Sequence, residues 1–259
     1  MKKVINIKRA ILISCLTICL FYLFLNFDSS IYHWQWQRAL RFFLTYQSGE
    51  WILGPLWDGL CLSLHIVSIS FFLAILLGLI IVTLRFMPSY VSQILSKSCI
   101  GLIRNTPLLI QLFMFYFALA PIFDFSPFWV AVWSLAIFEG AYMAEIFRAG
   151  INSIEKIQWD AGYALGFSNF QICIYILFPQ VLRRILPPLT NQCISLIKDS
   201  ALVSAIALPE LTMQAQLIIA DTFLSLELWI IVAILYILLS LIVTIPSKAL
   251  EHYYKWKWI

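Results

Sequence analysis

Long apolar runs with few or no charged residues are the feature that most limits what this chain can fold into. A membrane-spanning helix needs about 20 apolar residues, and six runs approach or exceed that length. They cover residues 10–27, 59–84, 105–123, 126–148, 185–209 and 228–247. Only 12% of the 259 residues are charged, about half the share in soluble domains. We therefore predict an all-α, polytopic membrane protein with six transmembrane helices.

The first run follows the basic segment MKKVINIKR and has two interpretations. A signal peptide also has a basic start and a short apolar region, but a small-x-small cleavage motif follows it. No such motif follows residue 27, so an uncleaved anchor is the better interpretation. We divide the chain into residues 1–54, an anchor plus an extracytoplasmic amphipathic segment, residues 55–247, the transmembrane domain, and residues 248–259, a cytoplasmic tail.

Lysine and arginine residues indicate the orientation of the runs in the membrane. With six spans and both termini in the cytoplasm, nearly all of these cations fall on the cytoplasmic side, as the positive-inside rule requires. The loop after the first run contains only two lysine or arginine residues, Arg38 and Arg41. In that outer loop, residues 31–47 carry aromatic residues at helical spacing. This pattern is compatible with a short amphipathic helix on the membrane surface, and equally with an irregular loop anchored by aromatic side chains.

Residues 149–184 form the longest predicted cytoplasmic stretch and read as two short helices joined by a turn. Asn152 or Ser153 is placed to cap the first helix, and Gly166 to end it as the residue after the C-cap. Ser168 begins a capping-box sequence for the second helix, which Pro179 ends or kinks. Gly162 lies inside the first helix, where glycine costs about 1 kcal/mol relative to alanine. Its position suggests close approach, either by another protein or by the chain itself.

The sequence of this stretch resembles a motif of binding-protein-dependent ABC transporter permeases. Asp160-Ala161-Gly162, three residues, Gly166, nine residues, Ile176, one residue and Phe178-Pro179 are similar to the family's EAA loop, with Asp in place of Glu, Gly in place of the second Ala, and Phe in place of Leu. The segments IRNTPLLIQLFMFYF, AYMAEIFRAGI and FPQVLRRILPPLTNQCISLIKDSALVSAI resemble the polar amino-acid uptake branch of that family, and the likeness covers about residues 55–246.

The resemblance implies a fold, a function and a set of partners. The fold would be a five-helix type I ABC importer core plus an extra N-terminal helix. The EAA loop would form a cytoplasmic coupling helix that contacts a separate ABC ATPase, with Asp160, Ala161, Gly162, Ala164, Leu165 and Gly166 as the contact residues. Further implied partners are a second permease chain, identical or related, an extracytoplasmic solute-binding protein, membrane lipid and a polar amino acid. The implied location is the bacterial cytoplasmic (inner) membrane.

The chain is not expected to be an enzyme or to hold a cofactor, a metal or nucleic acid. It contains no G-x-x-x-x-G-K-[ST] phosphate loop, so ATP would be bound and hydrolysed by the partner ATPase. It has three histidines and no H-E-x-x-H motif, which argues against a metalloenzyme. A secondary transporter or channel is the alternative function. Such folds often show repeats and paired broken helices, which this sequence does not display.

Ionisable and amide residues within the apolar runs are the candidates for the substrate pathway. They are Glu139, Lys198, Asp199, Arg104, Gln111 and Asn191. An amino-acid zwitterion in a low-dielectric path needs partners for both of its charges, which Lys198 and Glu139 are able to provide. A structural role between helices is equally open for those two and is favoured for Asp199. Glu145 and Arg148 are spaced to pair on one helix face. The transported amino acid and the identity of the second permease chain are not specified by the sequence.

Overall fold

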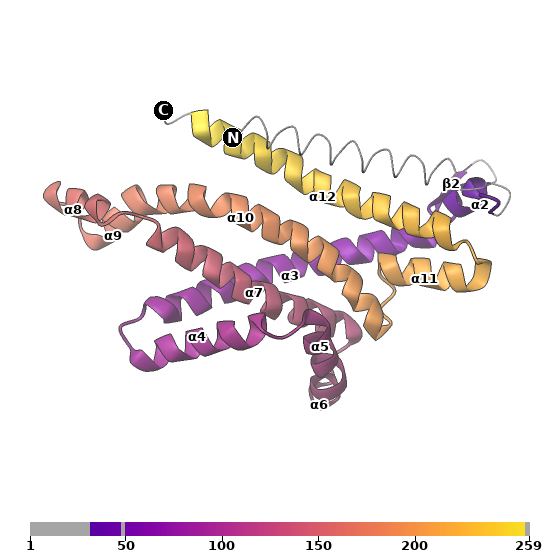
Figure 1. The fold of residues 1–259 in the computed structure, drawn as a ribbon, viewed down its shortest axis with the longest axis horizontal. Helices are drawn as coiled ribbons and strands as arrows, with labels where there is room; N and C mark the ends of the chain where they lie inside the picture. Colours follow the sequence, from indigo (N-terminus) through magenta and orange to yellow (C-terminus); the bar gives the residue numbers. More distant parts are fainter. Residues whose placement is uncertain (1–31, 48–49, 257–259) are drawn as a thin grey trace, which may run out of the picture. The chain divides into compact units, whose positions relative to one another are not determined.

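The computed structural model describes residues 32–47 and 50–256, and this part is mostly helical (Figure 1). The N-terminal part contains α2 (Trp36–Leu40), β1 (Leu44–Gln47) and β2 (Glu50–Leu53). The helices that follow are α3 (Pro55–Phe86), α4 (Tyr90–Arg104), α5 (Leu108–Phe113), the π-helix η1 (Met114–Leu119), α6 (Ala120–Phe123) and α7 (Pro127–Asn152). The last part comprises α8 (Lys156–Ala164), α9 (Asn169–Gln171), the π-helix η2 (Ile172–Leu177), α10 (Phe178–Asp199), the 3₁₀-helix η3 (Ser200–Ile206), α11 (Leu211–Thr222) and α12 (Ser225–Trp256).

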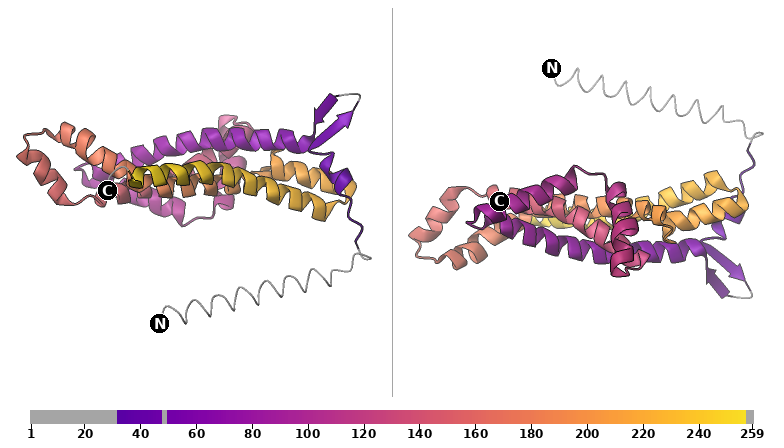
Figure 2. Two further views of the ribbon diagram at one scale, coloured as in Figure 1. Left: turned by 90° about the horizontal axis from the view of Figure 1, so that it is seen from above. Right: turned by 90° about the horizontal axis from the view of Figure 1, so that it is seen from below.

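The long helices α3, α7, α10 and α12 run beside one another in the transmembrane domain (Figures 1 and 2). The contact between α3 and α7 is the most extensive, and Gly78 is central to it. A Cβ at position 78 would lie 2.9 Å from Met143 Cβ, so only a glycine allows this separation of the two helices. Close helix packing through small residues is the usual device within membranes, because lipid provides no hydrophobic drive for helix association.

Four helical segments of the described residues are long and apolar enough to cross a membrane, and a bent helix pair would make a fifth span. The four are Pro55–Phe86, Pro127–Asn152, Asn169–Ile206 and Ser225–Ala249. They match the second, fourth, fifth and sixth predicted runs. The first predicted run, residues 10–27, lies outside the described residues. The helix α12 continues to Trp256, so most of the predicted tail, residues 248–259, is a continuation of this helix.

The third predicted run, residues 105–123, is not a straight span. It is the second arm of a bent pair, in which α4 and the segment Leu108–Phe123 meet at 101°. Pro107 has no N–H to continue the helix and disfavours helical geometry at the residue before it. The carbonyls released at the break are satisfied by side chains: Gln111 Nε2 donates to Ile103 O at 2.8 Å, and Thr106 Oγ1 donates to Leu102 O at 2.9 Å.

The predicted outer segment, residues 31–47, contains the five-residue helix α2 and the strand β1 in its described part, and neither interpretation of it anticipated a hairpin. β1 pairs with β2 in antiparallel register, with Leu44 opposite Leu53 and Tyr46 opposite Trp51. A short helix is present at α2, as one interpretation predicted, but it ends at Leu40. In the hairpin that follows, alternate residues share one face. Its base is tied to the start of α3, since Gly54 N–H donates to Phe43 O at 3.0 Å and Leu56 N–H donates to Phe42 O at 3.1 Å.

Pro179 does not end the second cytoplasmic helix, which corrects one of the two outcomes predicted for it. The helical path runs without interruption from α9 through η2 into α10, over Asn169–Ile206. Pro179 lies at the second position of α10, directly after the π-helix. In that wider turn the Phe178 N–H donates to Cys173 O, five residues back. The Pro179 ring therefore follows a segment that already departs from α-helical hydrogen bonding. A π-helix is a common place for such an irregularity.

Candidate functional site

The first candidate site is a helix–turn–helix elbow formed by residues 156–177, which comprise α8, the turn after it, α9 and η2. It projects at one end of the helical bundle, opposite the hairpin and α11 (Figures 1 and 2). Gly166 has φ +79°, the left-handed conformation that favours glycine. Gly166 N–H donates to Tyr163 O at 2.9 Å, and Phe167 N–H donates to Gly162 O at 3.1 Å. These two bonds form a Schellman motif, as the sequence predicted for Gly166.

The second arm of the elbow starts with the predicted capping box. Ser168 Oγ accepts from Gln171 N–H at 3.4 Å, and Gln171 Oε1 accepts from Ser168 N–H at 2.9 Å. Tyr163 adds a bond across the turn by donating its hydroxyl to Asn169 Oδ1 at 2.9 Å.

The start of the first arm was predicted wrongly. Asn152 is still within α7 and Ser153 is its C-cap, whereas Glu155 occupies the N-cap position of α8. Ser153 satisfies the end of α7 instead, because its hydroxyl donates to Gly150 O at 2.6 Å. The break between the helices therefore falls two to three residues later than the polar pair suggested.

Gly162 is the point of closest contact between the arms of the elbow. A Cβ there would lie 2.7 Å from Ile172 Cγ1 and 3.2 Å from Ile176 Cδ1. Gly162 is buried, while the five other residues predicted to contact an ATPase are exposed, namely Asp160, Ala161, Ala164, Leu165 and Gly166. The chain's own second arm thus provides the close approach that the glycine indicated.

The outer surface of the elbow is apolar and exposed. Leu165 is 72% exposed, and Ile157, Phe170 and Tyr175 have exposures of 63%, 73% and 69%. The sequence analysis did not select the last three. Ile157 was detectable, because Ile157, Ala161, Ala164 and Leu165 follow the spacing of an apolar helix face. Several large exposed apolar side chains on an element that projects from the bundle indicate a protein-interaction site.

Two contacts fix the base of the elbow to the bundle. Gln180 in α10 donates to Gln158 Oε1 at 3.2 Å and to Ile176 O at 2.9 Å. Arg184, one turn further along α10, donates to the carbonyl of Ser153 at the end of α7. The elbow is therefore joined to α10 through Gln158, and α10 is joined to the end of α7 beside the elbow.

The second candidate site is polar and lies along α7 and α10. Glu139 is fully buried, and Gln192 of α10 donates a hydrogen bond to Glu139 Oε2. Among the described residues, Glu139 Oε1 has no hydrogen-bond partner. Asp199 is a neighbouring acidic group of Glu139 and also lies within electrostatic range of Lys198. A buried carboxyl is costly unless it is paired, and Gln192 and Asp199 are the polar groups that approach Glu139.

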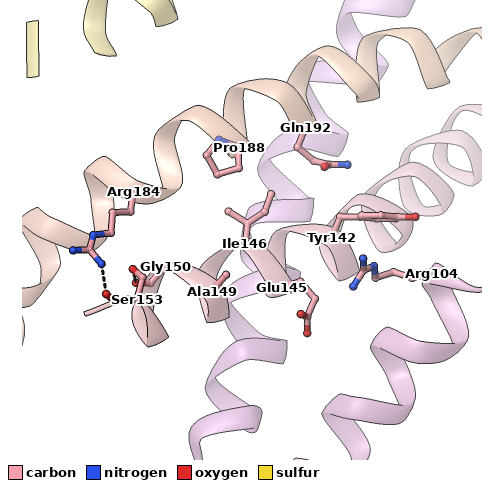
Figure 3. A pocket seen from close by; sticks show the side chains of 10 residues that line it. All are labelled: Arg104, Tyr142, Glu145, Ile146, Ala149, Gly150, Ser153, Arg184, Pro188 and Gln192. Atoms are coloured by element: carbon pink, nitrogen blue, oxygen red, sulfur yellow. Dashed lines mark hydrogen bonds between the residues drawn. The ribbon is translucent and has the colours of Figure 1, made fainter. Parts of the chain in front are cut away.

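An open hollow of about 440 Å³ adjoins this pair on the elbow side. Figure 3 shows Arg104 and Glu145 near one end of the hollow and Arg184 with Ser153 near the other. Arg104 stacks over the Tyr142 ring at 4.9 Å. The predicted pair on α7 is confirmed: Arg148 Nη2 lies 2.8 Å from Glu145 Oε2. Gln192 lines the hollow and bonds Glu139, so it connects the two.

The predicted pathway residues do not all gather in one cavity. Arg104 lines the hollow just described, whereas Gln111 is largely buried at the α4–α5 break. Lys198 lines a separate open hollow of about 420 Å³ together with Tyr236 and Ser240. Asn191 is exposed on α10. Asp199 interacts electrostatically with both Glu139 and Lys198. It therefore links these two candidate pathway residues.

The most extensive buried polar network was missed by the sequence analysis. Glu210 is fully buried and caps α11, with Met213 N–H donating to Oε1 at 2.9 Å. Ser63 of α3 and Tyr236 of α12 donate to Oε2 at 3.2 Å and 3.1 Å. The available signal was a charged residue after Pro209 and before an apolar run, the position of a helix N-terminus.

Comparison with known proteins covers the part of the chain from α3 to α12. The sequence profile of the family described as "Binding-protein-dependent transport system inner membrane component" matches residues 59–254. The glutamine transport system permease protein GlnP of Escherichia coli K12 is 37% identical over 197 residues, which cover 75% of this chain and 90% of that protein. The arginine transport system permease protein ArtQ of Bacillus subtilis is 35% identical over 196 residues, with the same coverage.

Two solved structures of ABC transporters have a similar fold. A crystal structure of an amino acid ABC transporter with histidines has a TM-score of 0.71 and 32% sequence identity, covering 76% of this chain and 93% of its own. An inward-facing MetNI methionine ABC transporter has a TM-score of 0.67 at 18% identity, covering 76% and 95%, and this second likeness concerns the fold alone. The matched profile spans most of the transmembrane domain, from α3 to α12, and the chain belongs to the family of binding-protein-dependent transport system inner membrane components.

Proposed function

We propose that the chain is the permease subunit of an ATP-driven importer of polar amino acids. The elbow carries this proposal: its apolar outer surface projects beyond the bundle and is fixed at its base to two long helices. Relatives named as glutamine and arginine permeases support the substrate class. A secondary transporter or channel would have no need of such a surface.

In this proposal the elbow is the coupling helix for a separate ABC ATPase. Asp160, Ala161, Ala164, Leu165 and Gly166 contact the ATPase, with Leu165 as the apolar anchor of a helix-in-groove interface. Gly162 contributes from beneath by allowing the second arm to support α8. ATP is bound and hydrolysed by the partner, and the chain itself performs no covalent chemistry.

The substrate pathway is formed with a second permease chain, identical or related. Lys198 pairs with the carboxylate of the amino acid and Glu139 pairs with its ammonium group, whereas Asp199 is a further pathway candidate. Arg104, Gln111 and Asn191 are further pathway candidates. A solute-binding protein delivers the substrate at the outer face. Movement of the elbow by the ATPase then exposes the pathway alternately to the two sides.

The chain lies in the bacterial inner membrane with the elbow and both termini in the cytoplasm. The elbow, which contains Lys156, and the end of α3, which carries Arg85, lie at the same end of the bundle (Figure 1). This clustering of cations follows the positive-inside rule.

Co-purification tests the coupling proposal. The affinity-tagged chain, expressed with its ATPase in the membrane, should retain that ATPase, and Leu165→Asp should release it because a carboxylate is costly in an apolar groove. Asn152→Asp, an exposed change on the cytoplasmic side outside the elbow, is the matched control and should retain the ATPase. Absence of any ATPase from the wild-type sample would favour a secondary transporter or channel.

A further inference from the structure

The helix α11 lies between two residues with a left-handed backbone conformation. Among the described residues, three non-glycine residues have positive φ, and two of them flank α11: Ala207 with φ 57° and Phe223 with φ 60°. Non-glycine residues in this conformation are strained and persist only where the surroundings enforce it. Ala207 is the C-cap of η3, shortly before α11, and Phe223 is the C-cap of α11 itself, so the turns before and after α11 are both held by their surroundings.

The contacts that hold α11 converge on Glu210. Its carboxylate accepts hydrogen bonds from α3, through Ser63, from the first turn of α11, through Met213, and from α12, through Tyr236. Ser63 Oγ also accepts from Leu211 N–H at 3.2 Å. Gly59 allows α3 to lie against the start of α11, because a Cβ there would be 2.9 Å from Leu211 Cα. One buried carboxylate therefore joins three helices at the end of the bundle opposite the elbow.

Tyr236 connects this network to the hollow that contains Lys198. Tyr236 and Lys198 both line that hollow, while the Tyr236 hydroxyl contacts Glu210 Oε2 at 3.1 Å and Thr212 Oγ1 at 3.0 Å. An occupant that binds Lys198 and shifts the Tyr236 ring would weaken the hydrogen bond to Glu210. The backbone provides a second connection, because most of the segment between Lys198 and Glu210 is the 3₁₀-helix η3, which ends at the left-handed residue Ala207.

We propose that Glu210 and Tyr236 form a latch that holds α11 against α3 and α12, and that occupancy of the Lys198 hollow releases it. Tyr236 is a positioning residue here, because it acts on α11 through Glu210. The inference rests on the proposed substrate pathway through Lys198. It adds the step by which an occupied pathway changes the packing of the outer end of the chain.

The test uses the complete transporter, with its ATPase and binding protein, in lipid nanodiscs. ATP hydrolysis is measured without substrate and with saturating L-glutamine or L-arginine. Tyr236→Phe removes only the hydroxyl. The ratio of stimulated to basal hydrolysis should fall about tenfold through a rise in the basal rate, because losing a hydrogen bond to a carboxylate shifts a two-state equilibrium by about that factor.

Thr212→Val is the matched control, because it removes a bond to the same hydroxyl but leaves Glu210 bonded. The ratio should stay within about twofold of the wild-type value, because this variant loses only a hydrogen bond between two uncharged hydroxyl groups. Ser63→Ala removes a different donor to Glu210 and should raise the basal rate as Tyr236→Phe does, so it decides the matter if Tyr236→Phe fails to assemble.

An unchanged ratio in Tyr236→Phe, or in Ser63→Ala if only that variant assembles, would overturn the latch. A parallel fall of both rates with a lower melting temperature would also overturn it, because that pattern indicates a purely structural role. A wild-type transporter that neither amino acid stimulates would refute the proposed function for these substrates, an outcome distinguishable from failure of the latch alone.

Discussion

The Cα of Gly162 lies directly against the side chain of Ile172, so that a Cβ at position 162 would be 2.7 Å from Ile172 Cγ1. Gly162→Val should therefore separate the two arms of the elbow. Overpacking of this kind costs about 1–3 kcal/mol. The melting temperature of the purified chain should fall, and ATPase retention should weaken although every exposed residue of the elbow is unchanged. Ala161→Val, at an exposed neighbouring position, is the control and should leave the melting temperature unchanged.

Gly166 supports a second prediction that separates backbone strain from steric conflict. No described heavy atom lies within 4 Å of a Cβ built at this position, but φ is +79°. Gly166→Ala should destabilise the elbow by about 1 kcal/mol through backbone strain alone, and Gly166→Asn should cost less because asparagine tolerates this conformation better. Limited proteolysis of the elbow should rank the variants Ala, Asn, wild type in decreasing rate of cleavage. Equal cleavage of all three would contradict the assignment.

The hydrogen bond between Gln192 and Glu139 predicts that the effect on stability of replacing one residue depends on whether the other is present. Gln192→Leu leaves a buried carboxyl without the donor to Oε2 and should destabilise the chain by about 2–3 kcal/mol. Adding Glu139→Leu removes the carboxyl and should restore much of that loss, since an apolar pair of similar size is tolerated in such positions. A double-mutant cycle on thermal unfolding in detergent checks this. Additive effects would show that the two side chains do not interact.

Lys198 supports a prediction about transport rather than stability. Lys198→Ala should abolish stimulation of ATP hydrolysis by L-glutamine or L-arginine while leaving the transporter assembled, because the side chain is exposed to the hollow and the proposed role is to pair with the substrate carboxylate. Size-exclusion chromatography verifies assembly in the same sample. Stimulation equal to that of the wild type would remove Lys198 from the pathway.

Local features of the fold were predictable from the sequence. The glycine turn at Gly166 and the capping box at Ser168 depend on residues within one turn of each other, and both are confirmed. The Glu145–Arg148 pair is equally local. The resemblance to ABC permeases, carried by motifs spread along the chain, also indicated the correct family.

Features that depend on distant residues were not predictable in this way. The contact between Glu139 and Gln192 joins positions 53 residues apart, and the contact of Glu210 with Ser63 joins positions 147 residues apart. The burial of Gly162 was hidden because a small residue in a helix indicates close approach without indicating which partner approaches. The hairpin was missed because its strands are only four residues long and their aromatic residues also fit a helical spacing.

The continuous helix from Asn169 to Ile206 has a mechanical consequence. Its 38 residues span about 57 Å at 1.5 Å per residue, and it begins in the elbow and ends beside Ala207. A rigid rod of this length that tilts by about 5° at the elbow displaces its far end by about 5 Å, roughly one helical turn. A protein that binds the elbow and tilts it would thus move the other end of this helix, on the opposite side of the membrane domain.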